Sequence, residues 1–218
     1  ASDWSWGALI FDFDNNGWKD IYISNAIFHE VTSLDFTDFI SDRNNIDQVV
    51  MKRGQFDWRD FAVMLSSNAL ANYAFINGLG ESENQGSGWI PTFTNQADQL
   101  GLGDPGFSNG AAYGDLDNDG DLDLFIGSHY DYPGYSANDD IHYFENTGTI
   151  TNPVFTYSTI SGIENQNNGN FSGLAFADMD NDGDLDLISG GSDSCQYYIN
   201  TGTLTNPSFE RQYGSNNP

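Results

Sequence analysis

An acidic segment of nine residues at positions 115–123, DLDNDGDLD, constrains the fold of this chain more than any other feature. Carboxylates stand at positions 1, 3, 5 and 9 of the segment, and Gly120 stands at position 6. Calcium is held by six to eight oxygen atoms, and helix-flanked calcium loops use side chains at positions 1, 3 and 5 and glycine at position 6. Those loops carry glutamate at position 12, whereas here Ile126 stands at that position in an apolar, strand-like run. The segment therefore predicts an ion-binding loop between strands.

The segment occurs three times, and we number the copies loop 1 (residues 12–20), loop 2 (115–123) and loop 3 (178–186). Loop 3 reads DMDNDGDLD, and loop 1 reads DFDNNGWKD, with Asn16 in place of the third carboxylate. A single copy could be a polar hairpin turn, since Asp, Asn and Gly favour turns. Three copies with glycine at one position favour ion binding. Carboxylates within about 6 Å of one another would otherwise repel and raise one another's pKa values.

Each loop lies between two predicted strands. The entering strands are small and apolar, as expected in a crowded core: residues 7–11, 110–114 and 173–177. The leaving strands are residues 21–24, 124–127 and 187–190. A second predicted hairpin follows in every copy, with strands at 72–78 and 89–94, 141–148 and 151–156, and 196–202 and 205–210. The sequence thus predicts three repeats of four antiparallel strands, which is typical of propeller blades or an open array of them.

The first repeat is longer than the others because of one insertion at about residues 28–70. Loops 2 and 3 start 63 residues apart, whereas loops 1 and 2 start 103 residues apart. The insertion has helical patterns at residues 34–41, 46–53 and 58–66, with Gly54 as a stop and Asp57 as a cap. It also holds most of the basic residues, namely Arg43, Lys52, Arg53 and Arg59. The insertion is either a helical cap over one blade or a projecting unit that binds a partner.

Composition limits the partners. The chain has 32 acidic and 6 basic residues, a net charge of −26, and three calcium ions would leave −20. Nucleic acid and anionic membranes are excluded, because binding phosphates requires clusters of Lys and Arg. The sequence contains no run of 18 apolar residues, so no membrane span is predicted. The single cysteine, Cys195, allows no internal disulfide and is expected to be a buried strand residue. The start at Ala1 suggests a processed terminus or a fragment, which together with the acidic excess favours a secreted, extracellular protein.

The sequence contains no recognisable set of catalytic residues, so we expect that the protein is not an enzyme. The sequence has no Gly-x-Ser-x-Gly, His-Glu-x-x-His or phosphate-binding glycine motif. His29, His129 and His142 are placed in the insertion or in loops between strands, and His129 with Asp131 is interpreted as ordinary loop sequence. The carboxylates that could serve a glycosidase are committed to the three loops.

The three acidic loops resemble FG-GAP/VCBS repeats, the blades of integrin-α-type propellers. Residues 6–24, the insertion, residues 72–77 and 108–115 further resemble bacterial proteins of the cartilage-acidic-protein-like family, over about the first 130 residues. The resemblance implies an all-β fold of three four-stranded blades in one domain, a partial or open propeller with a helical insert. The blades would cover about residues 6–96, 108–157 and 171–211.

The resemblance also implies three calcium sites, each formed by side chains at positions 1, 3, 5 and 9 and by the main-chain carbonyl at position 7. The implied ligands are Asp12, Asp14, Asn16, Trp18 carbonyl and Asp20; Asp115, Asp117, Asp119, Asp121 carbonyl and Asp123; and Asp178, Asp180, Asp182, Asp184 carbonyl and Asp186. Loop 1 departs from the pattern, and neutral Asn16 and nearby Lys19 make it the weakest predicted site.

Three blades are fewer than the four to eight of a closed propeller. Open strand edges are templates for pairing, and a head-to-tail contact that does not close produces a filament. We therefore expect an extracellular structural or adhesive module that binds calcium and another protein or copies of itself, with residues 1–5 and 212–218 as linkers or donated strands. Asn170 begins the one glycosylation sequon without proline, which is equally consistent with chance.

The alternative is a carbohydrate-binding, lectin-like module of a larger surface protein. Aromatic side chains stack on sugar rings, although many must fill the interfaces between blades. The candidates are Trp4, Trp6, Trp18, Trp58 and Trp89, with Tyr130, Tyr132 and Tyr135.

Overall fold

The computed structural model describes residues 5–26, 34–53, 65, 68–80, 90–128, 141–163, 173–190 and 195–213 of the 218-residue chain. The chain divides into two compact units. One comprises Ala1–Ala26 and Leu70–Pro218, and the other is Ile27–Ala69, close to the predicted insertion. None of the helices in the described part of the chain is long and apolar enough to cross a membrane.

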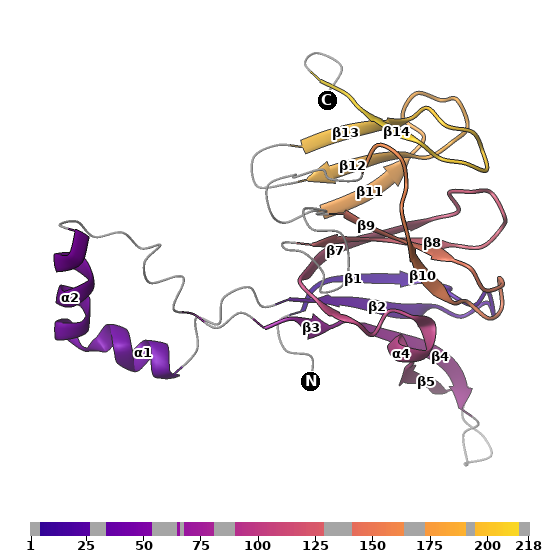
Figure 1. Cartoon of the computed structure of the whole chain (residues 1–218). Coiled ribbons are helices and arrows are strands. Elements are labelled where there is room, and N and C mark those ends of the chain that lie inside the picture. Colours follow the sequence, from indigo (N-terminus) through magenta and orange to yellow (C-terminus); the bar gives the residue numbers. More distant parts are fainter. Residues whose placement is uncertain are drawn as a thin grey trace. The chain divides into compact units, whose positions relative to one another are not determined.

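The first unit consists mainly of three antiparallel sheets of four strands, and each sheet is one predicted blade (Figure 1). Blade 1 is β1 (Ser5–Phe11), β2 (Asp20–Asn25), β4 (Tyr73–Gly80) and β5 (Ile90–Asn95). Blade 2 is β7 (Ser108–Gly114), β8 (Asp123–Ser128), β9 (Ile141–Asn146) and β10 (Phe155–Ser158), and blade 3 is β11 (Gly173–Ala177), β12 (Asp186–Gly190), β13 (Cys195–Asn200) and β14 (Phe209–Arg211). The described sheets are open and none closes into a barrel, so the predicted fold class of open all-β blades is confirmed.

Two shorter elements accompany the blades. Strand β3 (Leu70–Ala71) pairs with β6 (Pro105–Gly106), and the short helix α4 (Ala97–Leu100) follows β5. Asn95 stabilises the start of α4, because its side-chain Oδ1 accepts the backbone N–H of Ala97 at 3.2 Å. Helix α4 buries Ala97 and Leu100 against the blades.

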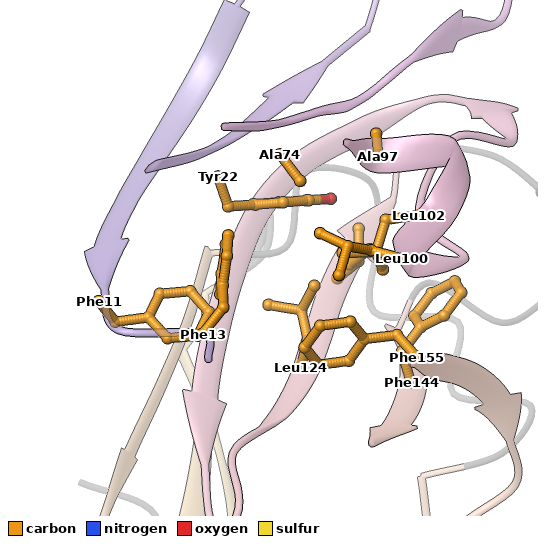
Figure 2. Packing of buried hydrophobic residues seen from close by; sticks show 11 residues of the cluster. Phe11, Phe13, Tyr22, Ala74, Ala97, Leu100, Leu102, Leu124, Phe144 and Phe155 are labelled. Atoms are coloured by element: carbon orange, nitrogen blue, oxygen red, sulfur yellow. The ribbon is translucent and has the colours of Figure 1, made fainter. Parts of the chain in front are cut away.

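The first core lies between blades 1 and 2 (Figure 2). Phe11, Phe13 and Tyr22 of blade 1 pack there with Leu124 and Phe144 of blade 2 and with Leu100 of α4. The ring of Phe11 also stacks on Tyr113, with centroids 4.1 Å apart and planes inclined by 9°. Burying side chains of this size stabilises the fold by about 1.5–3 kcal/mol each.

The second core lies between blades 2 and 3. Phe125 and Tyr143 of blade 2 pack there with Leu187 and Tyr198 of blade 3. Leu124 and Phe125 are neighbours in β8 but point to opposite faces, since side chains alternate along a strand. Because both faces of blade 2 are covered, β8 is buried along its whole length, and its central residues Leu124, Phe125 and Ile126 form a continuous apolar run.

The inserted unit contains two helices in the residues described. Helix α1 (Leu34–Ser41) has the predicted bounds, whereas α2 (Arg43–Arg53) begins earlier than the predicted residue 46. Asp42 explains the earlier start, because its Oδ1 accepts the N–H of Asn44 at 2.9 Å and its carbonyl accepts the N–H of Ile46 at 3.3 Å. The predicted helix at 58–66 lies outside the described residues, apart from Leu65.

Three predictions about individual elements were wrong. The last strands of blades 2 and 3 begin at Phe155 and Phe209, later than residues 151 and 205, because Thr149 pairs with Asn152 and Thr203 with Asn206 across a tight turn. His142 is not in a loop but is fully buried in β9, near the ring of Tyr157. Cys195 is in a strand as expected, but at the start of β13, where it is exposed rather than buried. His129, Asp131 and Asn170 lie outside the described residues.

Candidate metal centres

The three acidic loops connect the first two strands of each blade and share one backbone conformation. The residue at position 4 has a positive φ in all three loops: 50° at Asn15, 58° at Asn118 and 65° at Asn181. The glycine at position 6 also has a positive φ: 90° at Gly17, 98° at Gly120 and 103° at Gly183. Asparagine and glycine are the residues that adopt this left-handed conformation at least cost. The two turns wrap the chain around the loop's centre.

Side-chain oxygens of the loops accept hydrogen bonds from backbone groups further along the same loop. In loop 3, Asp178 accepts the N–H of Asp182 and of Gly183, both at 3.2 Å, and Asp182 accepts the N–H of Asp184, also at 3.2 Å. Loop 1 repeats this arrangement through Asp12 and Asn16. These bonds hold the side chains at positions 1 and 5 on the inner side of the loop.

The carboxylates gather in three groups, one in each loop. Within each group, one oxygen of every member lies within 4.8 Å of the others. The groups are Asp12, Asp14 and Asp20; Asp115, Asp117 and Asp119; and Asp178, Asp180 and Asp182. In every loop the structure therefore brings together the carboxylates at positions 1 and 3. The third member of the group is the carboxylate at position 5 in loops 2 and 3 and the carboxylate at position 9 in loop 1. The neutral Asn16 takes position 5 in loop 1, where its amide donates to Asp14 at 3.0 Å.

Aspartates at position 7 add negative charge to loops 2 and 3, although only a main-chain carbonyl was predicted there. Burial, followed by the charge of Asp119, raises the pKa of Asp121 to about 6. Burial and the hydrogen bond and charge of Asp182 raise the pKa of Asp184 to about 6. In loop 1 this position is Trp18, which is 43% exposed.

The aspartate at position 9 has a structural role that the sequence reasoning missed. Oδ1 of Asp123 accepts the N–H of Asn146 at 2.9 Å, and its Oδ2 accepts the N–H of Leu116 at 3.4 Å and the hydroxyl of Tyr143 at 3.1 Å. Burial raises the pKa of Asp123 to about 7, although these three donors oppose the shift. This carboxylate joins the loop to the third strand of its blade.

Blade 3 repeats this arrangement. Asp186 accepts the N–H of Asn200 at 2.8 Å, the N–H of Met179 at 2.9 Å and the hydroxyl of Tyr197 at 2.9 Å. In blade 1, Asp20 accepts the N–H of Asn77 and of Phe13, both at 2.7 Å, and Ala74 stands where the other blades have tyrosine. Burial raises the pKa of Asp20. The tyrosine repeated in the second strand after loops 2 and 3 was the available signal for this contact.

The asparagine that donates to position 9 also shapes the outer hairpin. Oδ1 of Asn146 accepts the N–H of Gly148 at 3.1 Å and the N–H of Val154 at 2.9 Å. Asn200 makes the same two contacts with Gly202 and Ser208. The Asn-Thr-Gly sequence is therefore both a turn signal and a link to the acidic loop.

The residues fit a hard divalent cation. Oδ1 atoms of Asp115, Asp121 and Asp184 are buried and receive no hydrogen bond from any described residue. A buried carboxylate oxygen without a donor is costly. Calcium prefers carboxylate and carbonyl oxygens. A bound calcium ion would supply the contacts that these oxygens lack, and its charge would offset the repulsion between the carboxylates. Asp115 belongs to the carboxylate group of loop 2, and Asp121 and Asp184 stand at position 7 of the wrapped loops 2 and 3.

Comparison with known proteins supports the broader of the two expected resemblances, the one to FG-GAP repeats. Residues 115–189 match the family model of the FG-GAP-like repeat, from the first aspartate of loop 2 into β12. No curated protein matches the chain. The chain is therefore an open series of antiparallel blades that contains a segment similar to an FG-GAP-like repeat. This similarity suggests an adhesion or structural repeat module. The resemblance to cartilage-acidic-protein-like proteins finds no support in these comparisons.

Proposed function

We propose that the chain is a calcium-binding structural or adhesive module that works outside the cell. The observation that carries the proposal is the set of buried, unpaired oxygens of Asp115, Asp121 and Asp184 inside wrapped acidic loops. Calcium would fix the tip of the first hairpin of each blade, and position 9 would transmit this order to the third strand. The loops would hold the module in one shape rather than perform a reaction, so we propose no enzymatic activity.

An extracellular location follows from the kind of site proposed. Calcium sites of extracellular modules work at about 10⁻⁴–10⁻³ M, which suits carboxylate groups whose members, apart from the buried Asp20, are exposed or half-buried. A ligand that binds only the folded state stabilises it by about 2.7 kcal/mol per site at a hundredfold excess over its Kd. Three such sites would contribute a large share of the stability of a domain of this size.

The proposal is tested by calorimetric titration of chelator-treated protein with calcium, with magnesium as the control ion. We expect saturable calcium binding and a marked rise in melting temperature. The double variants Asp115→Asn/Asp117→Asn and Asp178→Asn/Asp180→Asn should each remove one site, and Asp12→Asn/Asp14→Asn should remove the weakest. An unchanged melt in excess chelator, together with no heat of binding, would refute the calcium role.

A carbohydrate-binding role is the second candidate, and one hollow in blade 1 favours it. Trp18 and Phe93 line a hollow of about 460 Å³ together with the polar side chains of Asn77 and Lys19. An aromatic ring beside polar groups is a common way to hold a sugar. A glycan array with wild type and Trp18→Ala tests this role. Saturable binding that the variant loses would support it. Of the other aromatic candidates, Trp4, Trp58, Trp89, Tyr130, Tyr132 and Tyr135 lie outside the described residues.

A further inference from the structure

The two interfaces between blades repeat one arrangement. One face of a blade meets the opposite face of the blade before it. Between blades 1 and 2, Phe11 stacks on Tyr113. Between blades 2 and 3, Phe125 meets Phe176 edge to face, with centroids 4.9 Å apart. Each blade therefore has a leading face, which contacts the preceding blade, and a trailing face, which contacts the following one.

The leading face is formed by equivalent residues in every blade. The residue two places before each loop and the residue directly after it both lie on this face. In blades 2 and 3 they are Tyr113 with Leu124, and Phe176 with Leu187, and all four pack at an interface. In blade 1 the equivalent residues are Ile10 and Ile21.

The leading face of blade 1 has no preceding blade in the described chain. Ile10 is 63% exposed and Phe93 is 45% exposed. Ile10, Ile21, Pro91 and Phe93 line the hollow of about 460 Å³. Exposed apolar side chains gathered in this way, beside the polar Lys19 and Asn77, mark a site of association.

The trailing face of blade 3 is exposed along its first strand, although Tyr197 of its third strand is buried. Its equivalents in blades 1 and 2 include Leu9, Phe11, Ala112 and Phe125, which are buried or half-buried at the two interfaces. In blade 3 the matching residues are Ala175, Ala177 and Ile188. Both alanines are exposed, and Ile188 is half-buried. In the described residues, blade 1 thus exposes a leading face and blade 3 exposes part of a trailing face, the two kinds of face that meet at the interfaces on either side of blade 2 (Figure 1).

We propose that the leading face of blade 1 binds the trailing face of blade 3 of a second copy, head to tail. This inference rests on the proposed structural role and names its partner. It places the contact on sheet faces rather than on the strand edges or termini that the sequence suggested. A heterologous contact of this kind either closes into a ring or continues as a filament.

Lys19 supports this choice of partner. Position 8 is Leu122 in loop 2 and Leu185 in loop 3, and each leucine packs into the interface with the preceding blade. Leu185 lies close to Gly114, since a Cβ built there would be 2.9 Å from its Cδ1. In the head-to-tail contact, Lys19 of blade 1 would take the place of that leucine, and Ala177 of the other copy would take the place of Gly114.

The residue after Ala177 is Asp178, the first aspartate of loop 3. Lys19 would therefore approach an acidic loop, in a chain whose net charge of −26 otherwise opposes self-association. Lys19, which stands where loops 2 and 3 have leucine, would thus complement the negative charge of loop 3.

The test is light scattering coupled to size exclusion, across a concentration series in millimolar calcium. Ile10→Glu alters the leading face and Ala175→Glu alters the trailing face, and both residues are exposed. Each variant alone should lower the association constant about a hundredfold or more, because the contact would bury an unpaired charge. Leu204→Glu is the control at another exposed apolar residue, 56% exposed, and should associate like wild type.

Mixing the two variants gives the decisive result. Ile10→Glu keeps an intact trailing face, and Ala175→Glu keeps an intact leading face. An equimolar mixture should therefore form a one-to-one dimer and nothing larger. A wild type that stays monomeric, or an Ala175→Glu variant that associates like wild type, would overturn the proposal, and the latter would point to a contact between two leading faces.

The calcium role has a separate readout. If the melt responds to calcium while the protein stays monomeric, the head-to-tail contact is refuted and the calcium role stands. If association persists in excess chelator and the melt is unchanged, the contact stands without the calcium role. Far-UV circular dichroism of each variant shows that it is folded.

Discussion

The glycines at position 6 are required by backbone conformation rather than by space. A Cβ at Gly120 or Gly183 would meet no atom within 4 Å, yet φ at these residues is 98° and 103°. The left-handed conformation costs a residue with a Cβ about 1–2 kcal/mol. We predict that Gly120→Ala and Gly183→Ala each lower the free energy of unfolding by about 1–2 kcal/mol in chelator.

Gly173 is the matched control, because its neighbourhood is equally open and it lies in the extended strand β11. Gly173→Ala should change the free energy of unfolding by no more than about 0.5 kcal/mol. The measurement is urea unfolding. Equal losses in the loop variants and in the control would show that backbone conformation is not the cause.

The raised pKa values in loop 2 predict how stability changes with pH when calcium is removed. The pKa of Asp121 is about 6 and that of Asp123 about 7 in the folded chain, against about 3.9 in an unfolded chain. The folded state therefore binds protons more tightly, and this contribution is present at low pH and is lost as pH rises through 6 and 7. In chelator, we expect the melting temperature to fall between pH 5 and pH 8.

Asp121→Asn should make this pH dependence shallower, because it removes one of the titrating groups. Saturating calcium should reverse the trend, since calcium must displace protons at the lower pH. Melting curves at several pH values measure both effects. A melting temperature in chelator that rises between pH 5 and pH 8 would contradict the prediction.

In blades 2 and 3, a hydrogen bond from a tyrosine joins the acidic loop to the third strand of the blade. Tyr143 and Tyr197 donate their hydroxyls to the buried position 9 aspartates of blades 2 and 3. Removing a hydroxyl leaves a buried carboxylate with one donor fewer, and hydrogen bonds to charged groups are worth about 1.5–3 kcal/mol. We predict that Tyr143→Phe and Tyr197→Phe each destabilise the chain by an amount of this order and also weaken calcium binding.

Tyr113→Phe is the control, since this half-exposed ring contributes mainly by stacking on Phe11. It should change the free energy of unfolding by less than about 0.5 kcal/mol. Chemical unfolding in chelator measures the stability of all three variants, and calorimetry measures their calcium binding. Losses confined to the control would show that the tyrosine–aspartate contact is unimportant.

The inserted unit should be separable from blade 1. The insertion leaves after Ala26 and returns at Leu70, and Asn25 binds the returning chain: it donates to the carbonyl of Ala71 at 2.8 Å and to the side chain of Asn72 at 2.9 Å. The two ends are therefore close enough for a short linker. We predict that a Gly/Ser linker in place of residues 27–69 leaves the strand content and the number of calcium ions bound unchanged. A loss of the folded transition would show that the blades depend on the insertion.

Much of each element could be predicted from sequence because its signals are local. Alternation and turn residues located the first two strands of every blade, and the helical pattern at 34–41 located α1. The regular spacing of Asp and Gly located the carboxylate groups of the three loops. The bonds from Tyr143 and Asn146 to Asp123 could not be predicted, because they depend on the register between strands. The exposure of Cys195 and the burial of His142 also depend on which faces are covered, which a strand pattern does not specify.

At the scale of the whole molecule, blade 2 joins the other two blades through neighbouring residues. Leu124 is fully buried in the core shared with blade 1, and Phe125 is fully buried in the core shared with blade 3. A cavity on either side of β8 therefore weakens an interface between blades, not the interior of a single blade. If the interfaces make the blades cooperative, Leu124→Ala and Phe125→Ala should both lower one common unfolding transition.

The expected losses are about 2–5 kcal/mol for Leu124→Ala and about 3–5 kcal/mol for Phe125→Ala. Leu204→Ala, at an exposed site, should stay within about 0.5 kcal/mol of wild type. Tryptophan fluorescence, which in the described residues reports Trp6 and Trp18 of blade 1, is compared with far-UV circular dichroism of the whole chain. Coincident transitions in both variants would show that disruption at either face of blade 2 reaches blade 1. If the fluorescence transition moves in Leu124→Ala but not in Phe125→Ala, blade 1 unfolds independently and the blades are stable one by one.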